Sequence, residues 1–412
     1  MKVLRAYKTE FDLNNRQRTA CAKHAGAARF AYNWGLARRK QAYEQTGETL
    51  NAIALHRELN ALKKTDLGWM YEVSKCAPQE ALRDLDRAYA NFFRRAKGKK
   101  GGRVSGEVGF PHFKKKKRGQ GSFRLTGTIR VFEKHIQLPR LGLLRLKEAG
   151  YMPASGAKVL SATVSQRADR WFVSLQCEVE IPDPQPSKKP VCGVDLGVSR
   201  LATVSDGAVI ENPKALKRNL TQIKRLQRVV SRRKKGSANR KKAVSRLAKA
   251  HARVANIRNN ALHQATSLLA KTKSAAVLEN LNVSGMLKNH RLAQAIADVG
   301  MFEFRRQMAY KGAWYGCEVQ VADRFYPSSK TCSHCSHKKL TLGLGERMYI
   351  CEACGLEIDR DLNAAINLES LYLTTASSAG SNACGEDVRP AAVQATLAEA
   401  GTKQQAATRM FA

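Results

Sequence analysis

Four cysteines in the last quarter of the sequence have the spacing of a metal-binding motif. Cys332 and Cys335 form one Cys-x-x-Cys pair, and Cys351 and Cys354 form a second pair after fifteen intervening residues. Two such pairs supply the four thiolates of a tetrahedral zinc site, and the loop length is typical of a zinc ribbon. Four thiolates leave no position open for substrate, so we expect one structural Zn²⁺. The histidines beside the first pair are alternative ligands, although we expect them in solvent-facing loops.

Three acidic residues stand where core packing does not explain a carboxylate. Asp195 ends an apolar run just before a glycine, Glu279 ends a second apolar run within a basic neighbourhood, and Asp361 begins a helix of small residues after the second cysteine pair. Each has a simpler explanation by itself. Asp195 suits a turn, Glu279 suits a salt bridge, and either Asp361 or Asp359 suits a helix N-cap.

Taken together, an Asp on a first strand, a Glu on a later strand and an Asp on a late helix form an arrangement that holds two divalent ions. Two ions about 3.5–4 Å apart activate a water molecule and stabilise the leaving oxygen in phosphodiester hydrolysis. Oxygen ligands favour Mg²⁺ or Mn²⁺. We therefore predict an endonuclease with an RNase H-like (RuvC-type) domain in which Asp195, Glu279 and Asp361 are catalytic and bind both ions.

The charge of the chain indicates a polyanionic partner. The 412 residues include 72 Lys and Arg against 34 Asp and Glu, for a formal net charge of +38. Such an excess favours nucleic acid, because each neutralised phosphate releases a condensed counterion. No stretch approaches the roughly 20 apolar residues of a membrane span, and the N-terminus lacks the apolar core of a signal peptide. We expect a cytoplasmic, nucleoid-associated protein without disulfides or a membrane partner.

Two basic segments are the expected phosphate contacts. Eleven Lys and Arg lie between Arg94 and Arg118 in a glycine-rich context, and nineteen lie between residues 212 and 278 without one acidic residue. In the second segment two apolar stripes with helical spacing predict a hairpin of two basic helices. The residues expected to bind nucleic acid are Lys114, Lys115, Lys116, Lys117, Arg118, Arg232, Arg233, Lys234 and Lys235.

The order of patterns predicts an α/β multidomain chain. The segments are a strand at 1–10, a helical domain at 11–105, a small β-barrel or sandwich at 106–185, a first nuclease part at 186–330, the zinc ribbon at 331–356, a last nuclease helix at 357–372, and a disordered tail at 373–412. The proline-rich residues 182–190 mark the main boundary. The tail is expected to lack structure because its residues are small and polar.

Several of these segments resemble TnpB, a family of RNA-guided nucleases of IS200/IS605-type insertion sequences that is related to the miniature type V CRISPR nucleases. The similarity covers nearly the whole chain. The matching segments are 28–34 (ARFAYNW), 108–114 (VGFPHFK), 193–197 (GVDLG), 278–283 (LENLNV), 325–335 (FYPSSKTCSHC), 351–355 (CEACG) and 359–367 (DRDLNAAIN). One departure is a serine, instead of the commoner glycine, after the first cysteine pair.

The resemblance implies a role for each part. It implies that Asp195, Glu279 and Asp361 are catalytic, with Asp359 as the alternative third acid. It implies a wedge β-barrel that is interrupted by the helical recognition domain and holds guide RNA, and a ribbon inserted in the nuclease domain. It also implies that one protein per guide RNA from the transposon end cuts double-stranded DNA next to a short adjacent motif.

Two other functions fit the same residues. A DNA transposase would use this fold and these metals for strand transfer without RNA. A non-catalytic nucleic-acid-binding regulator would use the acids only for architecture. Metal-dependent nicking and copurifying RNA distinguish the three. The presence of all three acids favours an active enzyme over a regulator, and the resemblance favours a guided one.

Overall fold

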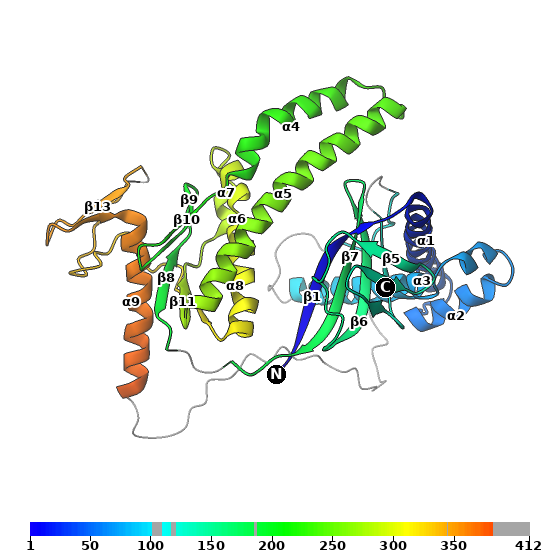
Figure 1. Cartoon of the computed structure of the whole chain (residues 1–412), viewed down its shortest axis with the longest axis horizontal. Coiled ribbons are helices and arrows are strands. Elements are labelled where there is room, and N and C mark those ends of the chain that lie inside the picture. Colours follow the sequence, from blue (N-terminus) through cyan, green and yellow to red (C-terminus); the bar gives the residue numbers. More distant parts are fainter. Residues whose placement is uncertain (101–108, 117–120, 185–187, 344, 382–412) are drawn as a thin grey trace.

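The computed structural model describes residues 1–100, 109–116, 121–184, 188–343 and 345–381. Figure 1 shows two units, each built around its own β-sheet, that are joined by the chain after β7. The N-terminal unit combines a seven-stranded sheet with long helices, and the C-terminal unit combines a five-stranded sheet with helices and a small two-stranded sheet. Within the described residues, no helix has the length and apolar character needed to cross a membrane.

The seven-stranded sheet is antiparallel and has the order β2-β6-β7-β1-β5-β4-β3. Its strands are β1 (Lys2–Asp12), β2 (Ser122–Leu125), β3 (Arg130–Val131), β4 (His135–Leu138), β5 (Gly142–Leu146), β6 (Ala157–Arg167) and β7 (Arg170–Glu180). The first strand ends two residues later than predicted, because Phe11 and Asp12 leave β7 and pair with β5.

The predicted barrel is not closed. Among the described residues β2 and β3 lie at opposite edges of the sheet and form no ladder with each other. A barrel needs its first and last strands to pair. The period-two alternation in the sequence identifies the buried face of each strand, but it carries no information about that pairing.

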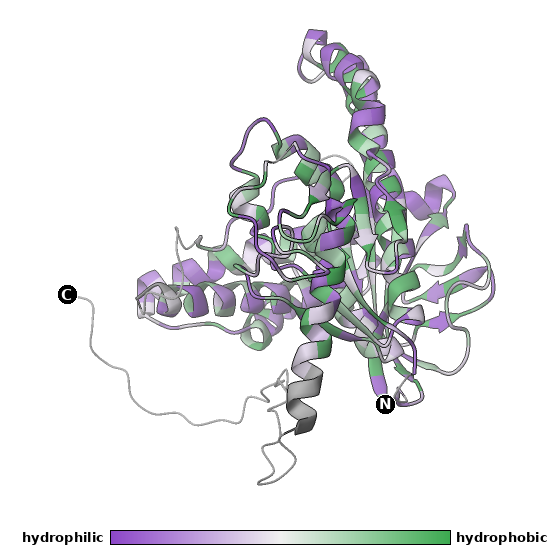
Figure 2. Ribbon diagram, turned by 90° about the vertical axis from the view of Figure 1, so that its left-hand side faces the viewer, coloured by the Kyte–Doolittle hydropathy of each residue, from purple (hydrophilic) through white to green (hydrophobic). Residues whose placement is uncertain are grey.

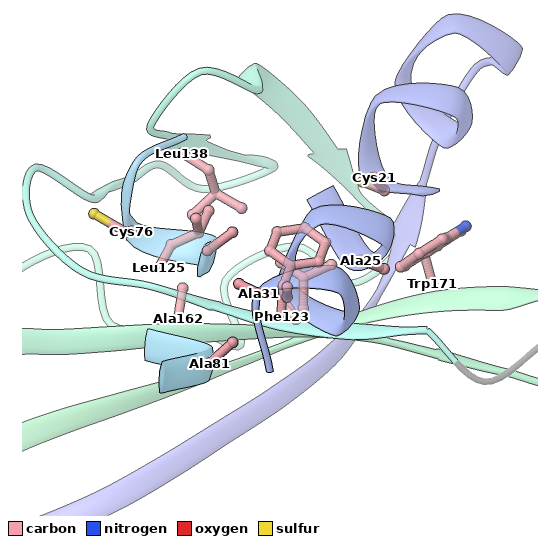
Figure 3. Close-up of a cluster of buried hydrophobic side chains, with 14 of the residues drawn as sticks. Cys21, Ala25, Ala31, Cys76, Ala81, Phe123, Leu125, Leu138, Ala162 and Trp171 are labelled. Atoms are coloured by element: carbon pink, nitrogen blue, oxygen red, sulfur yellow. The ribbon is translucent and has the colours of Figure 1, made fainter. Parts of the chain in front are cut away.

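Four helical segments occupy the predicted helical region. They are α1 (Asn15–Thr46), α2 (Ala52–Leu62), the 3₁₀ helix η1 (Gly68–Glu72) and α3 (Cys76–Lys100). Asn14 caps α1 in a reciprocal capping box with Gln17. Figure 3 shows how the helices meet the sheet: Phe123 and Leu125 of β2 pack among alanines such as Ala25 and Ala81. Small side chains allow the helices to approach the sheet closely, which gives this unit one continuous core.

The five-stranded sheet has the order β10-β9-β8-β11-β12. Its strands are β8 (Val191–Asp195), β9 (Arg200–Val204), β10 (Val209–Glu211), β11 (Ala275–Leu278) and β12 (Glu318–Val321). Strands β8, β11 and β12 are parallel, while β9 and β10 form an antiparallel edge. The helices of this unit are α4 (Ala215–Arg232), α5 (Ala238–Thr272), α6 (Val283–Met286), α7 (Ala293–Val299), α8 (Met301–Tyr315) and α9 (Arg360–Ser381).

Helices cover both faces of this sheet. Ala276 and Leu278 of β11 pack into one core with α5 and α8, whereas Val277 between them packs against Leu368 of α9. All four residues of β11 are buried. This arrangement explains why the strand reads as a continuous apolar run and not as an alternating one.

The predicted basic hairpin is present as α4 and α5, which project away from the sheet (Figure 1). A small apolar cluster that includes Ile223 and Val254 joins the two helices. Figure 2 shows that the outer end of the hairpin is mainly hydrophilic. The base of the hairpin is fixed by buried Asp298, which accepts hydrogen bonds from the Leu216 backbone N–H and from Arg258 at 2.8 Å.

The predicted tail begins too early. Helix α9 continues to Ser381, so the prediction of disorder from residue 373 is wrong for residues 373–381. Extending an existing helix by one residue costs little compared with nucleating one, and small polar residues permit that extension. Residues 382–412 lie outside the described residues.

Lys311 of α8 is buried without a carboxylate partner among the described residues. Its Nζ donates to Thr266 Oγ1 at 2.7 Å, to Ser267 Oγ at 2.8 Å and to the His263 carbonyl at 2.9 Å. Burial lowers the pKa of Lys311 to about 8. The folded state therefore binds fewer protons than the unfolded state above that pH.

We expect the free energy of unfolding to rise with pH above about 8 because of Lys311, until the unfolded lysine also deprotonates. Urea unfolding of the wild type and of Lys311→Met at several pH values measures this effect. The stability of the variant relative to the wild type should fall as pH rises. A pH-independent difference would contradict the assignment.

Candidate active site and metal centre

The first two candidate carboxylates lie at the same edge of the five-stranded sheet. Strands β8 and β11 are parallel neighbours, with Val194 opposite Leu278. Asp195 is the next residue on β8, and Glu279 is the next residue after β11. Two acids more than eighty positions apart in the sequence are therefore neighbours at the carboxyl ends of adjacent strands. This edge is where ligands bind in open α/β sheets.

Helix α9 brings the third carboxylate to the same edge. Asp361 lies in the first turn of α9, which packs against β8 (Figure 1). The contact depends on Gly193, because a Cβ atom there would lie 1.9 Å from the carbonyl oxygen of Ala365. Asn363 and Asn367 both donate to the carbonyl of Thr331, which fixes the helix to the loop before the first cysteine pair.

Burial and neighbouring carboxylates raise the pKa of both strand acids. Burial raises the pKa of Asp195 well above its ordinary value, and the charges of Glu279 and Asp361 raise it further, whereas Arg360 opposes the rise. Burial also raises the pKa of Glu279, against a hydrogen bond of 2.5 Å from Ser328 Oγ and the charge of Arg360. Crowded acids of this kind are stabilised when a cation neutralises their repulsion. The oxygen donor set therefore fits a hard divalent cation.

The structure separates the roles of Asp359 and Asp361. Asp359 Oδ1 accepts the backbone N–H groups of Asp361 at 3.0 Å and Leu362 at 3.2 Å, and its Oδ2 accepts from Arg200 at 2.9 Å. Asp359 is thus the N-cap of α9 and half of an ion pair. In the described part of the chain the Asp361 carboxylate has no hydrogen-bond or ion-pair partner, so it is the acid that is available to a ligand.

The simpler explanations for the other two acids also lose support. Among the described residues Glu279 forms no ion pair, and its partner is the hydroxyl of Ser328. Asp195 is the last residue of β8 and pairs with Thr203 of β9, so it lies in a strand and not in a turn.

The four cysteines gather as the spacing predicts. Their sulfur atoms all lie within 4.8 Å of one another, and no other group of three or more such ligands in the described residues is this close. The Sγ atoms of Cys335 and Cys351 are 3.5 Å apart, and those of Cys332 and Cys354 are 3.7 Å apart. A tetrahedron with Zn–S bonds of about 2.3 Å places its sulfurs roughly 3.8 Å apart. The cluster therefore fits one zinc ion.

The two cysteine pairs have matching backbone turns. Ser336 donates its N–H to the Cys332 carbonyl, and Gly355 donates to the Cys351 carbonyl, each at 3.0 Å. Both residues have a left-handed conformation, with φ of 61° and 74°. The unusual serine therefore keeps the turn that glycine forms more easily. Strands β13 (Met348–Ile350) and β14 (Glu357–Asp359) carry the second pair between them.

Cys351→Ser is expected to remove zinc and to lower any activity that depends on Asp361 by at least about tenfold, because β14 leads directly into α9 and a structural zinc site stabilises its own fold. Elemental analysis and a cleavage assay measure the two effects. His334→Ala is the matched control and should retain one zinc. Full activity of Cys351→Ser without zinc would refute the coupling, and loss of zinc from His334→Ala would make the histidine a ligand.

The predicted nucleic-acid contacts lie in two separate places. Arg232, Arg233, Lys234 and Lys235 are exposed at the tip of the α4–α5 hairpin. Lys115 and Lys116 are exposed in the segment after the α3 helix, whereas Lys117 and Arg118 lie outside the described residues. Lys114 has an intramolecular role, since its Nζ lies 3.8 Å from the Tyr32 ring centroid and Asn33 bonds both its N–H and its carbonyl.

Three residues of the site do not follow from sequence patterns of charge or spacing. Ser328 donates a hydrogen bond to Glu279, and the charge of Arg360 opposes the rise in pKa of both strand acids. Gly193 has no side chain, which allows α9 to pack closely against β8. Only Gly193 carries a signal, because a glycine inside an apolar strand often marks a close backbone approach.

Comparison with protein-family models gives three matches. Residues 174–290 match a family described as a probable transposase, residues 302–368 match a Cas12f1-like TNB domain, and residues 1–48 match a helix-turn-helix domain. In the structure this last stretch is β1 followed by one uninterrupted helix, α1.

Curated relatives match almost the whole chain. A protein of Streptomyces pristinaespiralis, provisionally named an RNA-guided DNA endonuclease, is 36% identical over 98% of this chain and 96% of its own length. A protein of Escherichia coli K12 with the same provisional description is 32% identical over 94% and 96%. Among solved structures, a Cas12f1 chain in complex with guide RNA and target DNA superposes with a TM-score of 0.52 at 13% identity, over 89% of this chain and 99% of that one. This last likeness concerns the fold alone.

Proposed function

Because the chain belongs to the TnpB family of RNA-guided DNA endonucleases from IS605-type elements, we propose that it uses an RNA from the transposon end to find double-stranded DNA and cuts that DNA beside a short adjacent motif. The observation that carries the catalytic part is the meeting of Asp195, Glu279 and Asp361 at one sheet edge. The net charge of +38 supports an RNA and DNA cargo.

We assign the five-stranded unit to an RNase H-like nuclease domain of the RuvC type. Asp195, Glu279 and Asp361 would hold two Mg²⁺ or Mn²⁺ ions, because hard divalent cations favour oxygen ligands. Bound ions of this kind supply an activated water and neutralise the leaving oxygen. Ser328 holds Glu279 by its hydroxyl, and Arg360 favours the ionised form of both strand acids.

The remaining parts receive roles that the family resemblance implies and that their charge supports. Base pairing with the guide would select the target sequence, while the protein contacts the adjacent motif and the backbone. The helices α1 to α3 would contact target DNA, and the open seven-stranded sheet would hold the guide RNA. The exposed hairpin tip at Arg232–Lys235 would contact phosphates. One protein per guide RNA is the expected assembly.

Coexpression of the chain with its transposon-end RNA tests the proposal. The purified complex should contain that RNA and should cut a plasmid matched to the guide when Mg²⁺ is present. A plasmid with a scrambled target is the matched control and should stay intact. Equal cutting of both plasmids, or strand transfer without RNA, would favour a transposase, and RNA binding without any cutting would favour a regulator.

A further inference from the structure

A cavity of about 290 Å³ is lined by Glu279, one of the three carboxylates. One wall is Glu279 itself, and another is Leu196, the residue after Asp195. A ligand bound in this cavity would therefore lie beside Glu279 and one residue along the chain from Asp195. The lining residues come from β11 and the segment after it, from α8 and from the loop after β12.

The cavity combines an apolar floor with two guanidinium groups. Leu196, Leu278 and Met301 form part of the floor. Arg305 and Arg324 are also in the lining, and in the described part of the chain neither forms an ion pair with an acid. Glu279 is the one acidic residue of the lining, so the positive charge of the cavity remains available to an anionic ligand.

Arg305 is held in place while part of its guanidinium stays free. Its Nη1 donates to Asn280 Oδ1 at 3.0 Å, and Asn280 directly follows Glu279. This bond fixes the guanidinium relative to the carboxylate. A guanidinium held by one arm can donate its other N–H groups to a phosphate oxygen.

Phe302 also lines this cavity, and its aromatic side chain is exposed to solvent. It is 62% exposed, although it lies on α8 three residues before Arg305 and therefore on the same side of that helix. Its neighbours Met301 and Phe304 are buried, so the helix has a separate core face. An exposed aromatic ring beside cationic groups is the combination that binds an unstacked base and its phosphate.

We propose that this cavity is a nucleotide subsite for the DNA strand being cut: the base next to the scissile phosphate stacks on Phe302, and its own phosphate binds Arg305 and Arg324. The proposal rests on the endonuclease function above. We infer a nucleotide as the occupant because the cavity combines an apolar surface, which suits a base, with two guanidinium groups, which suit a phosphate. Its lining includes Leu196 and Asn280, which directly follow Asp195 and Glu279 in the chain. Phe302, Arg305 and Arg324 are thus positioning residues, which place the scissile phosphate on the catalytic acids.

An abasic scan of the cut strand tests the subsite with the full RNA complex. Single nucleotides without a base are placed on either side of the cut, and single-turnover rates are measured. For the wild type, one position should slow cleavage roughly tenfold, as loss of one base–aromatic stack would. Phe302→Ala should slow cleavage of intact DNA roughly tenfold, and the abasic nucleotide at that position should then have no further effect.

Two matched controls lie on the same helix. Tyr315→Ala removes an exposed aromatic ring from the far end of α8, roughly 20 Å from Phe302. This variant should show the same cleavage rates as the wild type at every abasic position. Arg306→Gln removes the neighbouring cation, which lies outside the cavity, and should keep the cut position. Arg305→Gln and Arg324→Gln should instead spread the cut over several phosphates, whereas Arg305→Lys should partly restore one position. Loss of fold alone would not move the cut site.

The outcomes separate this proposal from the function on which it rests. If Phe302→Ala retains the wild-type rate, or if the abasic effect persists in that variant, the subsite is wrong although guided cleavage stands. If the wild type does not cut matched DNA, the endonuclease proposal fails. The subsite is then tested separately, by measuring the binding of single-stranded DNA. Single-stranded DNA containing 2-aminopurine should be quenched by the wild type and by Tyr315→Ala but less by Phe302→Ala. Equal quenching by all three proteins overturns it.

Discussion

Asp195→Ala is expected to lower the rate of DNA cleavage at least about a thousandfold, while the bound RNA and the thermal stability stay close to those of the wild type. Burial raises the pKa of Asp195 well above its ordinary value, and the charges of Glu279 and Asp361 raise it further. Loss of a carboxylate that would hold a divalent cation removes several kcal/mol of charge stabilisation from the transition state. Removing an acid with a raised pKa relieves repulsion, so the fold should not suffer.

The same assay distinguishes the two acids at the start of α9. Asp361→Asn should cause a loss as severe as that of Asp195→Ala. Asp359→Asn should have a much smaller effect, because asparagine still caps the helix and only the ion pair to Arg200 is lost. Cleavage, RNA content and thermal unfolding of the three variants are compared. If Asp359→Asn lowers cleavage more than Asp361→Asn does, the third acid has been misassigned. Full activity of Asp195→Ala would show that this site does not catalyse cleavage.

Gly193→Ala is expected to reduce cleavage roughly a hundredfold and to destabilise the protein by about 1–3 kcal/mol. The added Cβ would meet backbone atoms of α9, 1.9 Å from the Ala365 oxygen and 2.7 Å from the Glu369 nitrogen. Backbone cannot rotate away as a side chain can, so α9 must move and carry Asp361 with it. A displacement on the order of 1 Å is enough to cost about two orders of magnitude in rate.

Gly26→Ala provides the control for this change. Gly26 lies inside α1, and a Cβ there would meet nothing within 4 Å. Because alanine is the better helix former, this variant should be unchanged in activity and more stable by about 0.5–1 kcal/mol. Urea unfolding and single-turnover cleavage measure both variants. Wild-type rate and stability in Gly193→Ala would show that α9 does not approach β8 so closely.

The features that could be predicted from the sequence are those encoded by neighbouring residues. The cysteine spacing predicts a cluster that the structure confirms, and the apolar stripes predict the α4–α5 hairpin. The strand acids could be placed because an apolar run that ends in Asp195 or Glu279 defines where each strand stops. Their adjacency also needs the parallel pairing of β8 with β11, which no local pattern contains.

The features that could not be predicted depend on distant partners. The alternation favoured a barrel or a sandwich, and the resemblance implied a barrel, yet closure requires a pairing of β2 with β3 that the described strands lack. In the sequence, Asp359 and Asp361 are two aspartates near the start of a helix, with nothing local to distinguish their roles. The structure distinguishes them because Asp359 accepts hydrogen bonds from Arg200 and from the helix N–H groups. Phe302 and Arg305 share one side of α8, but their meeting with Arg324 and Glu279 at one cavity depends on the tertiary fold.

The late position of α9 in the chain sets the order in which the site can form during synthesis. The ribosome makes Asp195 and Glu279 long before Asp361, and the zinc cluster is completed only seven residues ahead of that last acid. The basic hairpin and the whole N-terminal unit are therefore synthesised before the third carboxylate. On the proposed assignment, the residues expected to contact nucleic acid are made before the catalytic site is complete.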